Sequence, residues 1–286
     1  CPGQEMEILK EGDAFLLIDG HFNFGQVVAS EALKLGKEKA RQAGTATIFI
    51  RNCNHVGRLG SYTQQAALEK FAAMMVVNGP ASGGVAPYGA IQGRMGTNPI
   101  TIAAPWGDDA MVLDMTSSAT AEGKVRVAFQ KGVPVPEGQL IDAQGQPTTD
   151  PSTYYADPGG AILPLGGNLG FKGYGLSVMI DVFGGMLSGF GICRTDLPPG
   201  TNGVWMYLVD ISAFTELDAY QELVAKYIAH IKAAERQPGV DEILMPGEIE
   251  LRRRDQRMAD GVEVPDETWR QISELADRLG VSLEGV

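Results

Sequence analysis

One histidine stands in a turn whose composition suits a ligand site. The segment Arg51–Tyr62 runs Arg-Asn-Cys-Asn-His-Val-Gly-Arg-Leu-Gly-Ser-Tyr, and it includes His55 and, three residues later, Arg58. An imidazole exchanges protons near neutral pH, so His55 is a candidate general acid or base. Arg58 is a candidate contact for an anionic substrate. The alternatives are a hydrogen-bonded structural histidine and a solvated arginine.

The flanking segments predict how this turn is positioned. Thr45–Ile50 is apolar and β-branched, which indicates a buried strand, and Tyr62–Phe71 has the pattern of a helix started by Ser61. Turns between a strand and a helix often hold ligands in α/β proteins, because the first N–H groups of the helix have no partner inside it.

Three further features could bind parts of a nucleotide. Lys172 is flanked by glycines and suits a phosphate or carboxylate, unless it is an ordinary surface lysine. Asp114 ends an apolar strand, where a carboxylate can bind ribose hydroxyls or, more commonly, cap the next helix. Four arginines follow Pro246-Gly-Glu248 and suit a pyrophosphate or a 2′-phosphate, or form an ion-paired surface: Arg252, Arg253, Arg254 and Arg257.

Several site classes lack support in this sequence. Neither G-x-G-x-x-G nor a phosphate-binding P-loop is present, which argues against a standard Rossmann domain, and the lack of H-E-x-x-H argues against a catalytic metal. The formal net charge of −12 argues against nucleic acid and anionic membranes as partners, and no apolar run is long enough to span a membrane. Three cysteines without metal-ligand spacing favour a reducing, cytoplasmic setting.

The order of the predicted elements favours an α/β fold. Early strands and helices alternate, whereas strands in the middle follow one another without helices, so the sheet should be mixed. Helices are expected at Val27–Ala43, Thr116–Val127 and Tyr174–Leu187, strands at Phe15–Asp19, Ala73–Asn78, Ile100–Ala104, Met111–Met115 and Val204–Asp210, and a hairpin at Gly138–Asp150. Beyond residue 214 the chain becomes charged and helical, which predicts domains at 1–214 and 215–286.

Taken together, six segments resemble the non-Rossmann malate/L-lactate dehydrogenase family, which also includes ureidoglycolate, sulfolactate and diketogulonate oxidoreductases and cyclic imine reductases. They occur in family order over nearly the whole chain: Asn54-His-Val-Gly-Arg-Leu-Gly60, Gly96-Thr-Asn-Pro99, Val112-Leu-Asp-Met-Thr-Ser-Ser118 with Gly123-Lys124, Thr148-Thr-Asp-Pro151, Leu163-Pro-Leu-Gly-Gly167 with Lys172-Gly-Tyr-Gly175, and Pro246-Gly-Glu248.

The resemblance implies a non-Rossmann NAD(P)-binding fold, with a mixed sheet flanked by helices, in a homodimer with active sites near the subunit interface. His55 matches a proposed acid/base, and Thr97 and Asn98 would lie near the substrate. The positions that match cofactor contacts are His55, Leu59, Asp114, Met115, Lys172, Gly247 and Glu248. The implied cofactor is NAD or NADP, with NAD favoured.

The sequence departs from the family pattern in two places. Family members begin with a helical segment bearing Ser-His-Gly and a downstream arginine, and this sequence starts just after the place where that segment should end. Residues 215–286 would pack with that helical domain. The imine reductases carry an aspartate near the position of Lys124, so the lysine favours the hydroxy-acid branch.

These features predict an NAD(P)-dependent oxidoreductase that moves hydride between nicotinamide C4 and C2 of a small 2-hydroxy or 2-oxo acid. His55 would take the hydroxyl proton as hydride leaves. The alternatives are a cyclic imine reductase of the same family and a shortened dinucleotide-binding remnant without activity. A metal-dependent hydrolase fits the sequence poorly.

Overall fold

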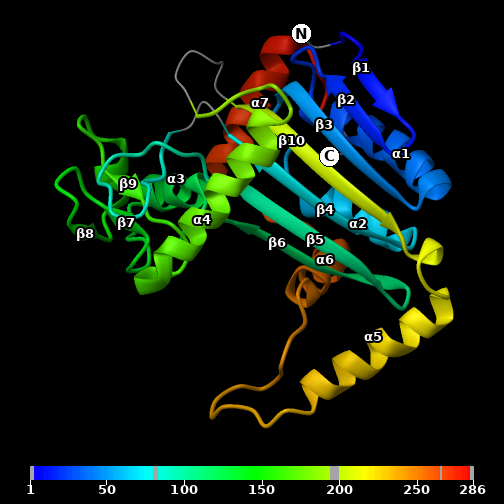
Figure 1. Cartoon of the computed structure of the whole chain (residues 1–286). Coiled ribbons are helices and arrows are strands. Elements are labelled where there is room, and N and C mark those ends of the chain that lie inside the picture. Colours follow the sequence, from blue (N-terminus) through cyan, green and yellow to red (C-terminus); the bar gives the residue numbers. More distant parts are fainter. Residues whose placement is uncertain (1–2, 80–82, 194–199, 265, 284–286) are drawn as a thin grey trace. The chain divides into compact units, whose positions relative to one another are not determined.

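The computed structural model describes residues 3–79, 83–193, 200–264 and 266–283 (Figure 1). The chain divides into two compact units, Cys1–Pro246 and Gly247–Val286. Helix α5 (Leu217–Lys232) belongs to the first unit, where Val224 and Ile228 form a small apolar cluster with Met245. The domain division that we predict at residue 214 stays a prediction.

A seven-stranded mixed sheet forms the centre of the first unit. Strands β2 and β3 pair in parallel, whereas the other described pairs of this sheet are antiparallel, as expected from the order of the elements. In spatial order the strands are β1 (Glu7–Gly12), β2 (Phe15–Asp19), β3 (Thr45–Asn54), β10 (Thr201–Asp210), β4 (Phe71–Asn78), β5 (Pro99–Trp106) and β6 (Asp109–Thr116).

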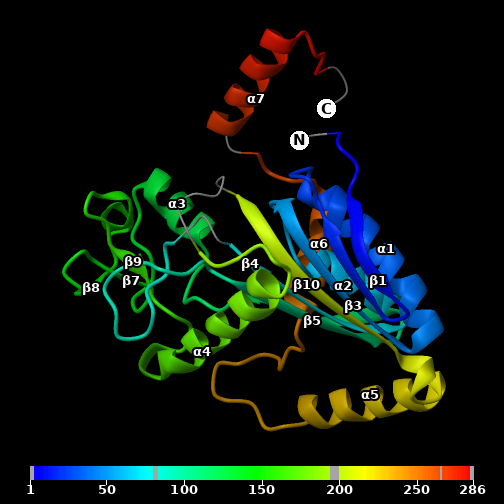
Figure 2. The same ribbon diagram turned by 45° about the horizontal axis from the view of Figure 1, so that its top comes forward.

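Helices cover both faces of this sheet (Figures 1 and 2). Helix α1 (Gly25–Ala43), which ends at the left-handed Gly44, and helix α2 (Gly60–Leu68) lie on one face, and α4 (Gly170–Ile180) lies on the other. Alternate residues of each central strand point toward α1 and α2, as in Ile48 and Ile50 of β3, and form the largest apolar core. The predicted mixed sheet flanked by helices is therefore confirmed.

A smaller region follows β6. It contains α3 (Glu122–Lys131) and a three-stranded sheet of β7 (Leu140–Ile141), β8 (Pro147–Thr148) and β9 (Ala161–Ile162), and β7 pairs with β8 as the predicted hairpin requires. The prediction of a helix at Thr116–Val127 is wrong at its start, because α3 begins only at Glu122. Ser117 N and Oγ both donate to the carbonyl of Thr97, so the chain stays irregular until Glu122.

Helix α4 differs from its prediction at both ends. It begins at Gly170 rather than at Tyr174, and after Ile180 it continues as a π-helical turn, Asp181–Met186. In the C-terminal unit, the predicted helices are present as α6 (Glu248–Asp260) and α7 (Asp266–Leu279).

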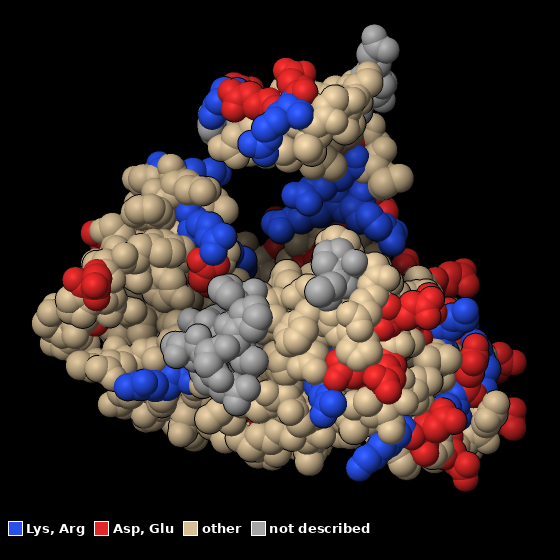
Figure 3. All heavy atoms as spheres, turned by 90° about the horizontal axis from the view of Figure 1, so that it is seen from above, with Lys and Arg blue, Asp and Glu red and all other residues tan. Residues whose placement is uncertain are grey.

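The surface carries charges of both signs. Figure 3 shows both acidic and basic side chains on the face drawn, including one compact group of basic side chains, so the formal net charge of −12 is not evenly spread over the surface. Among the described residues, no helix combines the length and the apolar content that crossing a membrane requires.

Candidate active site

Five central strands have an end at one edge of the sheet. The strand register pairs Asn54 with Thr201, Asn78 with Gly203, and Pro99 with Thr116, which brings the end of β3, β4 and β6 beside the start of β10 and β5. The predicted site residues from three separate stretches of the chain therefore meet at this edge: His55, Arg58, Leu59, Thr97, Asn98, Asp114 and Met115.

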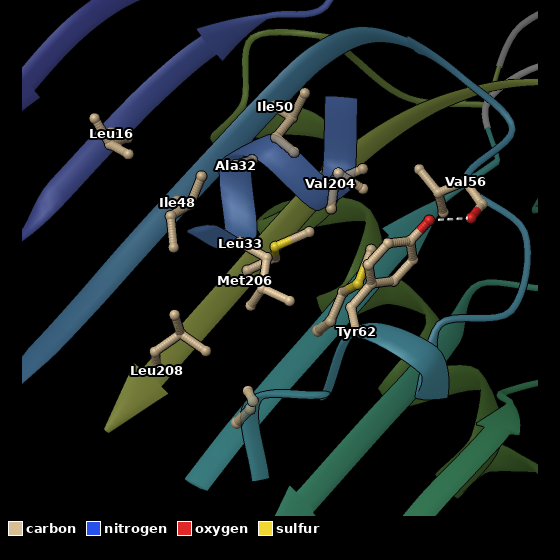
Figure 4. Packing of buried hydrophobic residues seen from close by; sticks show 14 of the residues in the cluster. Leu16, Ala32, Leu33, Ile48, Ile50, Val56, Tyr62, Val204, Met206 and Leu208 are labelled. Atoms are coloured by element: carbon tan, nitrogen blue, oxygen red, sulfur yellow. Dashed lines mark hydrogen bonds between the residues drawn. The ribbon is translucent and has the colours of Figure 1, made fainter. Parts of the chain in front are cut away.

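The His55 turn presents an exposed imidazole on an anchored backbone. Val56 donates its N–H to Oδ1 of Asn202 at 3.2 Å, and its carbonyl accepts the Tyr62 hydroxyl at 2.6 Å. Figure 4 shows Val56 and Tyr62 at the margin of the large core, joined by that hydrogen bond. Gly25 of α1 adds a third constraint, because a Cβ there would lie 2.0 Å from the carbonyl oxygen of Asn54.

Asp114 joins the end of β6 to the same turn. Its Oδ2 accepts the N–H of Gly60 at 2.9 Å and lies 3.4 Å from Nε of Arg58. The carboxylate therefore caps α2, whereas our sequence alternative was a cap on the following helix. Leu59 is buried, so its backbone is the part that a ligand could reach. Met115 faces the other side of the sheet and packs beside Ile100.

The Thr97–Asn98 turn is shaped by a buried side chain. Asn98 is fully buried with φ of +39°, and its Nδ2 donates to the carbonyl and to Oγ of Ser177 on α4, at 3.1 and 3.0 Å. Its Oδ1 accepts the N–H of Gly79 at 3.4 Å. Thr97 is half-buried. Asn98 therefore fixes the conformation of the turn, and its place near a substrate stays a prediction.

The remaining predicted residues lie on two helices. Lys172 is exposed in the first turn of α4, where its charge and the helix N-terminus both favour an anion. Gly247, with φ of +93°, precedes α6, and Glu248 is the first residue of that helix. Both belong to the C-terminal unit, and their role as cofactor contacts stays a prediction.

The cysteine beside His55 has no nucleophilic character. Cys53 is buried in the core, and burial raises the pKa of its thiol to about 12, so it stays protonated. Among the described residues, no group of three or more His, Cys, Asp or Glu side chains could hold a metal ion.

Four buried polar residues were absent from our sequence candidates: Asn78, Ser177, Asp181 and Asn202. Asn202 Nδ2 donates to the carbonyl of Asn78 at 3.3 Å, and Asn78 Nδ2 donates to Oδ1 of Asp181 at 3.1 Å. Each interrupts an apolar segment or stands at the end of one, and a polar residue in such a place is the signal that could have found them.

The chain is similar to known proteins over most of its length. A family model described as malate/L-lactate dehydrogenase matches residues 1–273. The malate dehydrogenase of Pyrococcus horikoshii is 35% identical over 285 residues, covering 97% of this chain and 78% of that protein. The L-lactate dehydrogenase of Cupriavidus necator is 34% identical over 290 residues, covering 98% of this chain and 81% of that protein.

Solved structures agree with the sequence comparison. The structure of malate dehydrogenase from Pyrococcus horikoshii superposes with a TM-score of 0.86 at 31% identity, covering 97% of this chain and 78% of that one. The structure of Δ1-piperideine-2-carboxylate reductase from Pseudomonas syringae gives a TM-score of 0.77 at 30% identity, with 95% and 80% covered. The hydroxy-acid dehydrogenase is thus the closer of these two structures.

Proposed function

The chain belongs to the malate/L-lactate dehydrogenase family, and we propose that it is an NAD(P)-dependent oxidoreductase that interconverts a small 2-hydroxy acid and its 2-oxo acid. Malate and lactate, the acids in the names of its relatives, both carry a hydroxyl next to a carboxylate. The observation that carries the proposal is an exposed imidazole on an anchored turn, beside a strand-end carboxylate.

Predicted residues at this edge and on α4 have the chemistry that a nicotinamide dinucleotide requires. Asp114 offers a carboxylate to ribose hydroxyls, Lys172 offers a cation to phosphate, and Met115 offers an apolar surface. We favour NAD over NADP, because a carboxylate at the ribose would repel a 2′-phosphate. When bound, the nicotinamide supplies or accepts the hydride.

His55 moves the proton in this scheme. In oxidation its neutral imidazole takes the proton of the substrate hydroxyl, and in reduction its imidazolium returns that proton to the carbonyl oxygen. The hydrogen bonds of the Val56 N–H to Asn202 and of the Val56 carbonyl to Tyr62 hold the turn, while the imidazole stays exposed to substrate. Preorganisation of this kind lowers the cost of reaching the reactive geometry.

Arg58 and Thr97 are the groups that we assign to the substrate. The Arg58 side chain is 44% exposed, which leaves it accessible to a carboxylate although it pairs with Asp114. Asn98 would act indirectly, by fixing the turn that carries Thr97.

The test combines binding with turnover. Titration calorimetry with NADH and NADPH should show saturable binding, stronger for NADH. The oxidation of NADH should then depend on pyruvate or oxaloacetate. Turnover of Δ1-piperideine-2-carboxylate in place of both would favour the imine reductase alternative, which the exposed Lys124 argues against. Binding without turnover of any of these substrates would favour the non-enzymatic alternative.

We also propose a homodimer in the cytoplasm. The sheet face toward α4 leaves Phe15, Ile102 and Leu113 36–44% exposed, and Phe171 and Met179 of α4 itself are about half exposed. An apolar surface of this kind suits a second copy of the chain. Cys53 and Cys193 are free thiols, as expected in a reducing compartment. Light scattering on the purified protein tests the dimer.

A further inference from the structure

Asp181 is a buried carboxyl group to which the proposed reaction assigns no role. It is 8% exposed and is the first residue of the π-helical turn that extends α4. Single π-helical turns inside α-helices are rare and frequently lie at functional sites.

Gly185 of this π-helical turn and Gly203 of β10 allow the turn to approach the sheet edge closely. A Cβ at Gly185 would lie 2.1 Å from the carbonyl oxygen of Gly191, and a Cβ at Gly203 would lie 2.4 Å from the carbonyl oxygen of Gly184. Real side chains do not fit at such distances, so glycine is required for this approach. As a result, the Asp181 carboxyl lies 3.1 Å from the amide nitrogen of Asn78.

From Asp181, hydrogen bonds lead to both turns of the candidate site. In one direction its carboxyl accepts a bond from the Asn98 side chain. In the other direction it accepts a hydrogen bond from Nδ2 of Asn78. The backbone carbonyl of Asn78 in turn accepts a hydrogen bond from Nδ2 of Asn202. Oδ1 of Asn202 then accepts the N–H of Val56, next to His55. Buried side chains therefore connect the acid/base turn with the Thr97–Asn98 turn.

An ionised carboxylate can only accept hydrogen bonds, so both asparagines must turn their NH2 groups toward it. Their oxygens then face backbone donors, Gly203 N–H for Asn78 at 3.3 Å and Gly79 N–H for Asn98 at 3.4 Å. A protonated carboxyl or a neutral amide at position 181 would place a donor against one of these NH2 groups and break that bond, so that Asn78 would be held only by the carbonyl of Gly191, or Asn98 only by Ser177.

We propose that Asp181 is a positioning residue for hydride transfer: together with the carbonyls of Gly191 and Ser177 it holds the amides of Asn78 and Asn98, and so keeps the His55 turn aligned with the Thr97–Asn98 turn. The catalytic part of this inference rests on the proposed function. The structural part, that Asp181 holds both turns, does not depend on it.

The surroundings of Asp181 give it a distinctive pH dependence. Burial raises its pKa, and the hydrogen bonds from Asn78 and Asn98 partly oppose that rise. Cys193 is the titratable group that faces it from the following loop, with a thiol pKa raised mainly by burial and further by the Asp181 charge. Arg51 of β3 lies beside Gly189, beyond the π-helical turn. Among described residues, β4 and the turn before β5 contribute asparagine amides.

Hydrogen exchange tests the structural part without an activity assay. Peptides that cover residues 52–60 and 95–99 should exchange about tenfold faster in Asp181→Asn than in wild type. The control is Asp150→Asn, which changes an exposed aspartate bonded to Ser152, and it should leave both peptides unchanged. Unchanged exchange in either peptide of a folded Asp181→Asn would overturn the proposal. If that variant does not fold, the wild-type protein gives the test. Its exchange rates, corrected for the intrinsic pH dependence of exchange, should rise in both peptides as pH falls and Asp181 becomes protonated.

Kinetics test the catalytic part. Reduction of the oxo acid consumes a proton, so a decline of kcat at low pH reports a group that must be deprotonated. Asp181→Asn should lower kcat about 10- to 100-fold, change cofactor affinity less than about twofold, and abolish that decline. A lower kcat that keeps the wild-type decline would overturn the catalytic part. Absence of wild-type turnover would refute the proposed function, and exchange would still decide whether Asp181 holds the two turns.

Discussion

The turn that carries His55 and the turn that carries Asn98 meet at one edge of the sheet, but they are held in opposite ways. His55 is exposed, and its neighbours Val56 and Leu59 are buried and fix the backbone around it. Asn98 is fully buried, and its own amide is the group that fixes the backbone. In the first turn the backbone is anchored to present a side chain, and in the second a side chain is used to shape the backbone.

This difference follows from what each residue has to do. A group that transfers a proton must reach the substrate, so it is exposed and contributes little to packing. A group that shapes a turn must be desolvated and fully hydrogen-bonded, because a buried amide without partners is costly. Substitutions at the two positions should therefore separate chemistry from stability.

The largest effect is expected at His55. His55→Ala removes the proton-transferring group, so kcat should fall about 10²- to 10⁴-fold. Cofactor affinity should fall far less than kcat, and the thermal midpoint should stay close to wild type, because the imidazole is exposed. Steady-state kinetics and calorimetry measure both quantities. His230→Ala, an exposed histidine on α5, is the matched control. If His55→Ala turns over as fast as wild type, His55 has no catalytic role.

Asn98→Ala should show the reverse pattern. It removes the bonds to Ser177 and Gly79 and places alanine, which adopts a positive φ less readily than asparagine, at this position, so the unfolding free energy should fall by roughly 3 kcal/mol. The KM for the oxo acid should rise more than kcat falls. Denaturant unfolding gives the first value, and Asn168→Ala, at an exposed asparagine, is the control. A loss of kcat without a loss of stability would contradict the shaping role.

A smaller effect is expected when the anchor of the His55 turn is weakened. Tyr62→Phe removes the hydroxyl that donates to the Val56 carbonyl, which should cost about 1 kcal/mol of stability and lower kcat a few-fold. Burial raises the pKa of Tyr62 to about 12, so the wild-type bond persists throughout the assay range. Tyr227→Phe, on the exposed side of α5, should change neither value. A kcat equal to wild type in Tyr62→Phe would show that the Asn202 bond alone holds the turn.

The anchored turn was more predictable from the sequence than the shaped one. Alternating apolar residues in β3 and the helical pattern of α2 bracket His55 on either side, and both patterns act over a few neighbouring residues. The strands themselves follow from the same local signal, and so does the pair of β5 with β6, which are neighbours along the chain. His55 was therefore placed correctly in a turn between a strand and a helix.

The contacts that shape the second turn have no local signal. Asn98 and Ser177 are 79 residues apart, and Asn78 and Asp181 are 103 apart, so nothing near either residue specifies its partner. The irregular stretch before α3 has the same origin, because the bonds from Ser117 to Thr97 replace a first helical turn. Such pairings depend on the completed sheet.

The smallest effect is expected at Glu69, where a substitution tests whether the packing of α1 and α2 matters for catalysis. Glu69, after α2, bonds to Lys37 and, at 3.0 Å, to Arg41 of α1. The hydrogen bond from Lys37 is the main reason that the pKa of Glu69 lies below its ordinary value of 4.5. The ionised form is therefore favoured in the folded state, and its contribution to stability is present above that value and lost as pH falls through the lowered pKa.

Glu69→Gln should therefore cost about 1 kcal/mol or less at neutral pH, because the carboxylate is 38% exposed, and the deficit should disappear in acid. Unfolding curves at several pH values measure both. Turnover should stay at the wild-type value, because the turn is held through Val56 rather than through this ion pair. A parallel loss of kcat would mean that the spacing of α1 and α2 itself positions His55, and the contrast between an anchored and a shaped turn would then be too simple.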